Sequence, residues 1–224
     1  MSSHYELPPS EYERRRAGHF HRRRVAVVAD AVQRFVPGGG TVVEIGCGPG
    51  AMLADVADAR PDASFLGLDV EPEMVAHAQR AHSGAGLSFA VADVGRDRLP
   101  VSCDLVLAVD VLHHVHDPAA FLRGVVPQLE PAGRVLAIEP NRLHPYVFAK
   151  QERMRRVGLD EDHFRTGEWE DAFRDVGLVV QERRYLHAFP AWFRSPPQLL
   201  AALEPVLERV PPVAGSVVLV VGRP

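Results

Sequence analysis

The sequence contains only two cysteines and a single lysine among its 224 residues. Cys47 and Cys103 are too few for a disulfide framework, and neither stands in a spacing typical of a cysteine metal site. No apolar run approaches the ~20 residues that span a bilayer, and the amino terminus is polar and rich in arginine. We therefore expect a cytoplasmic protein without membrane insertion.

The composition is otherwise that of an ordinary globular protein, with 46% hydrophobic and 24% charged residues. The length suits one well-buried core, so we expect a single domain over residues 1–224. Within it we distinguish a helical amino-terminal arm (1–40), a core (41–140) and a substrate-side, sheet-completing part (141–224). The net charge of -4 makes nucleic acid an unlikely partner.

Residues 41–50, TVVEIGCGPG, combine a short β-type run, one acid and three glycines. The β-branched residues around Glu44 suit a buried parallel strand. Glycines permit backbone angles and close approaches that a Cβ would block; they are Gly46, Gly48 and Gly50. Because residues 51–59 read as a helix, the amides of its first turn face the same crevice. The segment predicts a strand that delivers a backbone-lined turn to a ligand.

Acids stand at the ends of three further apolar runs. Residues 64–69 end in Asp69, residues 87–92 are followed by Asp93, and residues 103–109 are followed by Asp110. A carboxylate at the tip of the second strand is placed to accept hydrogen bonds from two ribose hydroxyls. This arrangement indicates a ligand of the adenosine type.

Strands and helices alternate along the core, which predicts an α/β fold with a parallel sheet. Further strands are expected at 133–139, 178–186 and 216–221, and helices at 72–82 and 168–176. Asp117 and Pro118 open another helix as its N-cap and first residue.

The motifs VVEIGCGPG (42–50), LDV (68–70), ADV (92–94) and DLVLAVDVLHHVHDP (104–118) arrive in an order that resembles the class I S-adenosylmethionine-dependent methyltransferases of small-molecule type. The resemblance covers about residues 41–140 and continues weakly to the carboxyl end. It implies a Rossmann-like doubly wound, mostly parallel seven-stranded sheet with helices on both faces and the last strand antiparallel. It also implies S-adenosyl-L-methionine as cofactor.

The same resemblance assigns roles to the strand ends. Glu44 and the glycines line the methionine and ribose, Asp69 holds the ribose hydroxyls, and Asp93 faces the adenine amino group. The expected cofactor-binding residues are Glu44, Gly46, Gly48, Gly50, Asp69, Val70, Asp93, Val94 and Asp110. A structural interpretation stays open for two of them, because Asp93 suits the cap of a turn and Asp110 the cap of the following helix.

Charge helps to choose between cofactors. S-adenosylmethionine carries a sulfonium and an ammonium, so a site rich in carboxylates suits it better than it suits an anionic dinucleotide. An NAD(P)-dependent oxidoreductase stays the alternative, because Gly46, Gly48 and Ala51 fit the looser dinucleotide pattern. A cofactor-binding protein without catalysis is a third interpretation.

Residues 10–36 read as one helical arm that ends at the breaker PGGG of residues 37–40. Its arginine triplets, 14–16 and 22–24, are seven to eight residues apart and thus fall on one helical face. We expect a solvated face. An anion-binding stripe is the other interpretation, over a charged small substrate or, in an RNA methyltransferase, over nucleic acid.

Histidines cluster just after the fourth strand, where the reactive end of the cofactor is expected. His113 and His114 are the candidate catalytic residues, because a phenol or alcohol acceptor must lose a proton to a base. A metal site that includes His116 is disfavoured, since zinc needs more ligands than this spacing supplies. The alternative is a turn in which one imidazole points outward and the other bonds to backbone.

Candidate acceptor contacts lie in two places. In similar enzymes an arm of this kind closes over the substrate, which makes Tyr12 and His19 candidates. In the polar loop expected from the fifth strand to about residue 167, the candidates are Arg142, His144 and Tyr146. The apolar cluster FPAWF at 189–193 completes the core, covers the acceptor or forms a homodimer contact, and we expect the core.

These observations together predict an S-adenosylmethionine-dependent methyltransferase. The acceptor atom is an oxygen, nitrogen or carbon of a small molecule, and the second product is S-adenosylhomocysteine.

Overall fold

The computed structural model describes residues 7–156, 166–189 and 195–224, apart from the side chains of Arg15, Arg16, Met154, Arg155 and Thr166. Within these residues the strands are β1 (Thr41–Ile45), β2 (Ser64–Asp69), β3 (Leu87–Val91), β4 (Cys103–Val109), β5 (Leu129–Pro140), β6 (Val179–Leu186) and β7 (Ser216–Gly222). The helices are α1 (Pro9–Arg16), α2 (His19–Phe35), α3 (Ala51–Asp58), α4 (Pro72–Ala81), α5 (Pro118–Val125), α6 (Pro145–Arg156), α7 (Thr166–Asp175) and α8 (Gln198–Leu207). Short 3-10 turns are η1 (Leu112–His114), η2 (Val126–Gln128) and η3 (Pro211–Val213).

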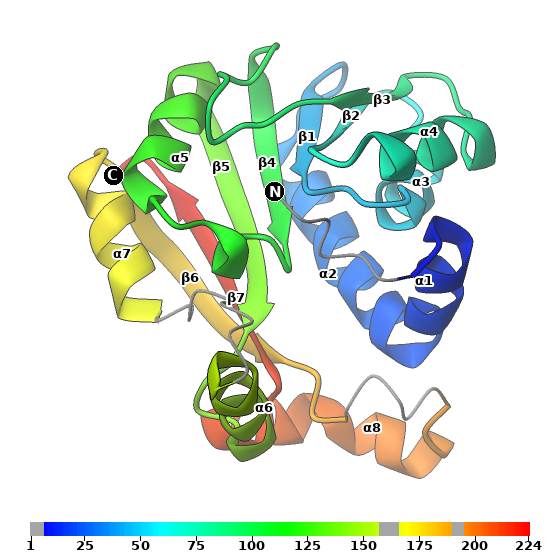
Figure 1. Ribbon diagram of the computed structural model, residues 1–224, viewed down its shortest axis with the longest axis vertical. Helices are drawn as coiled ribbons and strands as arrows, with labels where there is room; N and C mark the ends of the chain where they lie inside the picture. Colours follow the sequence, from blue (N-terminus) through cyan, green and yellow to red (C-terminus); the bar gives the residue numbers. More distant parts are fainter. Residues whose placement is uncertain (1–6, 157–165, 190–194) are drawn as a thin grey trace.

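The strands form one seven-stranded sheet in the order β3-β2-β1-β4-β5-β7-β6 (Figure 1). Strands β1 to β5 pair in parallel, whereas β7 runs antiparallel to both β5 and β6. The order reverses at β1, between β2 and β4, and ligands of open α/β sheets bind outside the carboxyl ends at such a point. The Rossmann-like, mostly parallel fold predicted from the sequence is confirmed.

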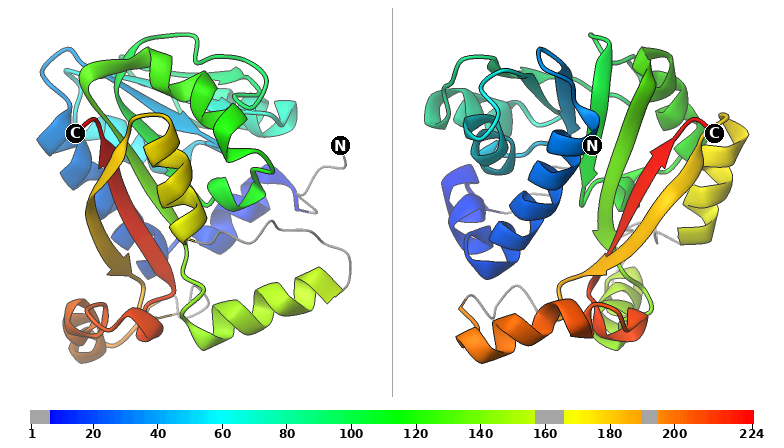
Figure 2. Two further views of the ribbon diagram at one scale, coloured as in Figure 1. Left: turned by 90° about the vertical axis from the view of Figure 1, so that its left-hand side faces the viewer. Right: turned by 180° about the vertical axis from the view of Figure 1, so that it is seen from behind.

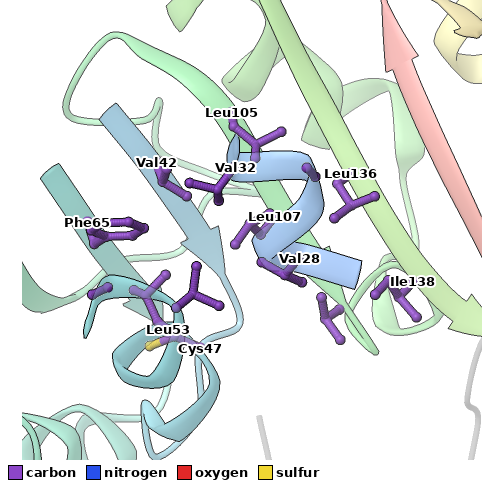
Figure 3. Close-up of a cluster of buried hydrophobic side chains, with 14 of the residues drawn as sticks. Val28, Val32, Val42, Cys47, Leu53, Phe65, Leu105, Leu107, Leu136 and Ile138 are labelled. Carbon is purple, nitrogen blue, oxygen red and sulfur yellow. The ribbon is translucent and has the colours of Figure 1, made fainter. Parts of the chain in front are cut away.

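Alternation of side chains along each strand builds a core on each face of the sheet. On one face, α2 and α3 contribute side chains such as Val28 and Leu53 to a cluster with Leu107 (Figure 3). Helix α4 adds Val75 to the same cluster. On the other face, α5 and α7 pack side chains such as Leu122 and Phe173 onto the sheet. The helices therefore cover both faces, as a doubly wound sheet requires.

The amino-terminal arm is two helices rather than the single helix expected over residues 10–36. Gly18, with φ 124° and ψ -155°, breaks it between α1 and α2, a conformation that only glycine adopts at low cost. The arginine triplets therefore belong to different helices and do not share one helical face. Glu13 of α1 contacts His77 at 3.1 Å and His82 at 3.3 Å, so α1 packs against α4.

The stretch after the fifth strand was expected to be a loop, but it contains α6. Helix α8 was not expected from the sequence. Both helices lie beyond the carboxyl ends of β4 and β5 (Figures 1 and 2). The fifth strand also begins at Leu129 rather than at 133, across a register shift opposite Cys103. Residues 190–193 of the apolar cluster lie outside the described residues. Of the helices that the structure describes, none combines the length and apolar character of a membrane span.

Candidate active site

The glycine turn after β1 adopts left-handed backbone angles, with φ of 69° at Gly46, 54° at Gly48 and 87° at Gly50. A Cβ at Gly46 would lie 2.7 Å from Cγ2 of Val111, and one at Gly50 would lie 2.8 Å from the ring of Phe89. A Cβ at Gly48 would meet nothing within 4 Å. Two glycines thus allow close packing, and the middle one borders open space.

Asp69 ties the end of β2 to this turn. Its Oδ2 accepts the backbone N–H of Gly48 at 2.7 Å, and its Oδ1 accepts that of Glu71 at 2.9 Å. Burial raises the pKa of Asp69, and the backbone donors oppose this rise. Each carboxylate oxygen has a second lone pair, so both oxygens can also accept bonds from a ligand. Val70, next along the chain, is 53% exposed.

Glu44 is the acid inside β1, and it lies on the sheet face that α2 and α3 cover. Only 3% of its surface is exposed, and its Oε2 has no hydrogen-bond partner. Burial raises the pKa of Glu44 well above its usual value, the charge of Asp69 raises it further, and Arg24 opposes the rise. Glu44 is therefore a buried acceptor that a cationic donor would satisfy.

Arg24 of α2 connects the arm to the end of β4. Its Nη2 donates to Oδ2 of Asp110 at 2.7 Å, and its guanidinium lies 4.4 Å from the ring centroid of Phe20. With 6% exposure, Arg24 contradicts the solvated face expected for the second triplet. Asp110 has φ 53° and pairs with this guanidinium, which places it at the site without the helix-capping role considered above.

The histidines after β4 lie in different environments. His113 is 7% exposed, and its Nδ1 lies 2.7 Å from Oε2 of the fully buried Glu139, at the end of β5. His114 is exposed, and its ring centroid lies 4.0 Å from that of His113. The exposure of His114 agrees with the turn interpretation, whereas Nδ1 of His113 contacts a carboxylate, a partner that the turn interpretation did not include.

The candidates after β5 come together at the start of α6. The guanidinium of Arg142 lies 5.6 Å from the ring centroid of Phe148, and the rings of His144 and Tyr146 meet edge to face at 6.5 Å. Nη1 of Arg142 and Nδ1 of His144 are buried without a hydrogen-bond partner. These groups retain capacity for a polar ligand.

The two candidates from the amino-terminal arm, Tyr12 and His19, lie on different helices. His19 begins α2, and its Nε2 lies 2.5 Å from Oε2 of Glu204, a residue of α8 with 1% exposure. Arg23 and Glu208 add a second contact at 2.5 Å between the same helices. Tyr12 is half-buried on α1, which packs against α4 instead. His19 therefore lies where the arm meets α8, and Tyr12 lies on the helix of the arm that packs against α4.

Asp93 and Val94, which follow the third strand, contact other parts of the protein. Oδ1 of Asp93 accepts the N–H of Gly95 at 3.1 Å, which is the turn-capping role considered above. Val94 is 4% exposed and packs in the core with α5. Among the described residues, no three His, Cys, Asp or Glu side chains are grouped to hold a metal ion.

Known proteins are similar to this chain in sequence and in fold. Residues 43–135 match the family model described as "Methyltransferase domain". The ubiquinone biosynthesis O-methyltransferase of Aliivibrio fischeri strain MJ11 is 29% identical over 114 residues, 50% of this chain and 49% of that protein. The chain is therefore similar to the class I S-adenosylmethionine-dependent methyltransferases over a segment that makes up about half of its length or less. It spans about half the length of the curated relatives it matches.

Two solved structures show how far the shared fold extends along this chain. The S-adenosylmethionine-dependent methyltransferase of Mesorhizobium loti is 21% identical, with a TM-score of 0.63 over 89% of this chain and 100% of that chain. The magnesium protoporphyrin IX methyltransferase of Synechocystis PCC 6803, solved with bound SAH, is 18% identical, with a TM-score of 0.61 over 91% and 84%. The fold therefore extends beyond the matched segment to most of the chain.

The residues of this chain fit S-adenosylmethionine as a cofactor. The unpartnered Oε2 of Glu44 suits an ammonium, and the two oxygens of Asp69 suit a pair of hydroxyls. The open space at Gly48 lets a ligand approach the backbone. The negative charges of a pyrophosphate would be repelled by these buried carboxylates.

Sequence reasoning missed one residue of the site, Glu139. The sequence does contain a signal for Glu139, because this acid lies next to the last residue of the fifth strand, much as Asp69 is the last residue of the second. Its partner His113 is 26 positions earlier, and pattern alone does not pair them.

Glu44→Gln tests the electrostatics of the candidate site. Because the pKa of Glu44 is raised in the folded state, the native protein holds a proton there that the unfolded chain releases, and stability falls as pH rises between the two pKa values. Glutamine cannot ionise, so we expect the variant to lose less stability than the natural protein from pH 5 to pH 8, measured by urea unfolding. Its affinity for S-adenosylmethionine should fall about fivefold, since a neutral bond replaces a charged one. Parallel pH curves would contradict the assignment.

Proposed function

We propose that the protein transfers the methyl group of S-adenosylmethionine to a hydroxyl oxygen of a small molecule and releases S-adenosylhomocysteine. The observation that carries the proposal is the buried, unpartnered carboxylate oxygen of Glu44 beside the glycine turn. A cationic ammonium compensates such an oxygen, whereas the phosphates of a dinucleotide do not. The match to the methyltransferase domain and the similarity to O-methyltransferases of ubiquinone biosynthesis support the same reaction.

When bound, S-adenosylmethionine supplies an electron-poor methyl carbon on a cationic sulfur. The protein's own contribution is to hold and align: Glu44 binds the ammonium, and Asp69 binds the ribose hydroxyls. Displacement in line demands alignment above all, because positive charge disperses as the bond forms. A hydroxyl acceptor must also lose its proton, and His113 is the base in this proposal.

The acceptor in this proposal is an apolar molecule with a phenolic hydroxyl. Large apolar side chains are exposed at the start of α6, with exposures of 60% at Leu143, 60% at Tyr146 and 48% at Phe148. They lie at the carboxyl end of the sheet, where the acceptor is expected (Figure 2). Exposed apolar clusters favour apolar ligands. The relatives named for ubiquinone biosynthesis support an aromatic acceptor.

The remaining predictions from the sequence belong to the same proposal. They are a single domain over 1–224, a cytoplasmic location and a homodimer. Val70, Asp93 and Asp110 are further proposed contacts of the cofactor, and Tyr12, His19, Arg142, His144 and Tyr146 are proposed contacts of the acceptor.

The test is a transfer assay with S-adenosylmethionine labelled on the methyl group. The purified protein is incubated with panels of phenols, amines, carbon acids and transfer RNA, and products are identified by mass. We expect label on a phenol oxygen and stoichiometric S-adenosylhomocysteine. Label on nitrogen, carbon or RNA would correct the acceptor class, and cofactor binding without turnover on any panel would contradict an enzymatic role.

A further inference from the structure

Helix α8 is amphipathic in the reverse of the usual sense, because its acid is buried and its large aliphatic side chains are exposed. Glu204 is 1% exposed, and Glu208, just after the helix, is 8% exposed. The aliphatic side chains are between 38% and 76% exposed; they are Leu199, Leu200, Leu203, Val206 and Val210. Leu199, Leu203 and Val206 are three or four positions apart and thus lie on one side of the helix. We call the five the aliphatic face, and exposed clusters of this kind mark interaction surfaces.

Contacts of the buried acids hold α8 in this orientation. Oε2 of Glu204 lies 2.5 Å from Nε2 of His19, and Oε2 of Glu208 lies 2.5 Å from Nη2 of Arg23. Oε1 of Glu208 also accepts the backbone N–H of His187 at 2.8 Å. Turning the aliphatic face inward would break all three contacts, and breaking a buried ion pair is costly. The fold therefore keeps the aliphatic face directed away from the rest of the protein.

The exposed charges of α8 and α6 are mostly cationic. Residues 198–210 contain three charged side chains, and because both acids are buried, the exposed one is Arg209. Helix α6 lies at the same end of the molecule and exposes Lys150 and Arg153 (Figures 1 and 2). Its only acid is half-buried and contacts an arginine of the same helix. These cations stand out in a protein whose net charge is -4.

We propose that the aliphatic face of α8 docks reversibly on the surface of a bilayer that contains anionic lipids. Helices that lie in a membrane interface bury their apolar side chains at the acyl boundary, and lysines and arginines add attraction to anionic headgroups. A bilayer thus supplies an apolar layer for the leucines and valines and negative charge for the cations. Because the protein as a whole is negative, it approaches such a surface with its cationic end first. Docking needs no methyl transfer, so it goes beyond the proposed function.

A second copy of the chain is a poorer occupant of the aliphatic face. A two-fold contact brings the same surface of both copies together. Arg209 of each copy would then enter the contact, whereas Glu204 and Glu208, the acids of this segment, are buried within each copy. The charges therefore favour anionic lipid over self-association.

Sedimentation of the purified protein with lipid vesicles tests the docking. Vesicles of phosphatidylcholine alone are compared with vesicles made of equal parts of phosphatidylcholine and phosphatidylglycerol. We expect binding to the mixed vesicles to be about tenfold tighter or more, and to weaken at high salt. A protein that stays in the supernatant with both kinds of vesicle, or binds both equally, overturns the proposal without any variant.

Val206→Gln and Leu203→Gln test whether the aliphatic face makes the contact. Both side chains are exposed, so we expect the variants to fold, which circular dichroism checks. Each substitution should weaken binding to the mixed vesicles about fivefold or more, because one apolar side chain no longer enters the acyl boundary. Val101→Gln is the matched control: Val101 is 38% exposed, but it lies just before β4, at the amino ends of the strands. It should leave binding unchanged.

The other outcomes are distinguishable. Vesicle binding that survives both α8 substitutions overturns the proposal. A dimer that forms without lipid and that Leu203→Gln dissociates assigns the aliphatic face to a second copy and overturns it as well. Methyl transfer without vesicle binding overturns the docking and leaves the proposed function standing. Vesicle binding without methyl transfer supports the docking and counts against the proposed function.

Discussion

Asp69→Ala should weaken binding of S-adenosylmethionine by about 2 to 3 kcal/mol, which is roughly 30- to 150-fold in Kd. Two hydrogen bonds from ribose hydroxyls to one buried charge account for this loss. The same carboxylate also holds the N–H of Gly48, so the substitution loosens the turn that borders the ligand. Isothermal titration calorimetry on the folded variant measures the change.

Asp93→Ala is the matched control for Asp69→Ala. Asp93 also follows a strand, but its carboxylate caps a turn at Gly95 and contacts Arg96 at 3.5 Å near solvent. One hydrogen bond to the adenine amino group limits the expected loss to about tenfold or less. Equal losses for both variants, or unchanged affinity for Asp69→Ala, would remove the ribose-binding role of Asp69.

Gly50→Ala should lower the free energy of unfolding by about 2 to 5 kcal/mol. The left-handed conformation at φ 87° costs a residue with a Cβ about 1 to 2 kcal/mol. The new methyl group would lie 2.8 Å from the ring of Phe89 and 2.9 Å from Cβ of Ala78, and such overpacking costs a further ~1 to 3 kcal/mol. Urea unfolding followed by circular dichroism measures the loss.

Gly39→Ala separates the two contributions to the Gly50 effect. Gly39 has a similar φ of 77°, but a Cβ there meets nothing within 4 Å, so only the cost of about 1 to 2 kcal/mol remains. If the two variants lose the same stability, the contact of the glycine turn with Phe89 and Ala78 is not tight, and the packing described for Gly50 is wrong.

The strands were predictable because their residues match a simple physical pattern. The boundaries predicted for β4 agree with the structure, since a β-branched and aliphatic run suits a strand buried on both faces. Helix α8, in contrast, was not predictable from its sequence pattern. Its Leu199 and Val206 are exposed, whereas Glu204 is buried against His19, so the apolar pattern does not mark the face that packs. Pro205 inside the helix obscures it further.

The candidate site was predictable only in part, because some of its contacts join elements that are far apart in the sequence. The rule that polar residues stand at or just after the ends of parallel strands finds Asp69 and Asp110, because it depends on position along one strand. The pairing of Asp110 with Arg24, 86 residues earlier, depends on how α2 lies across the sheet. Such pairings follow from the packing of whole elements, which no local pattern in the chain records.

The central claim is that the crevice beside residues 44–50 binds an adenosyl ligand with a cationic methionine end. A crystal structure of the protein grown with S-adenosylhomocysteine and, separately, with NAD⁺ tests it most directly. The account predicts the first ligand in the crevice, its ammonium on Glu44 and its ribose hydroxyls on Asp69, and no dinucleotide in the second crystal. A dinucleotide at the glycine turn, or S-adenosylhomocysteine bound elsewhere, would contradict it.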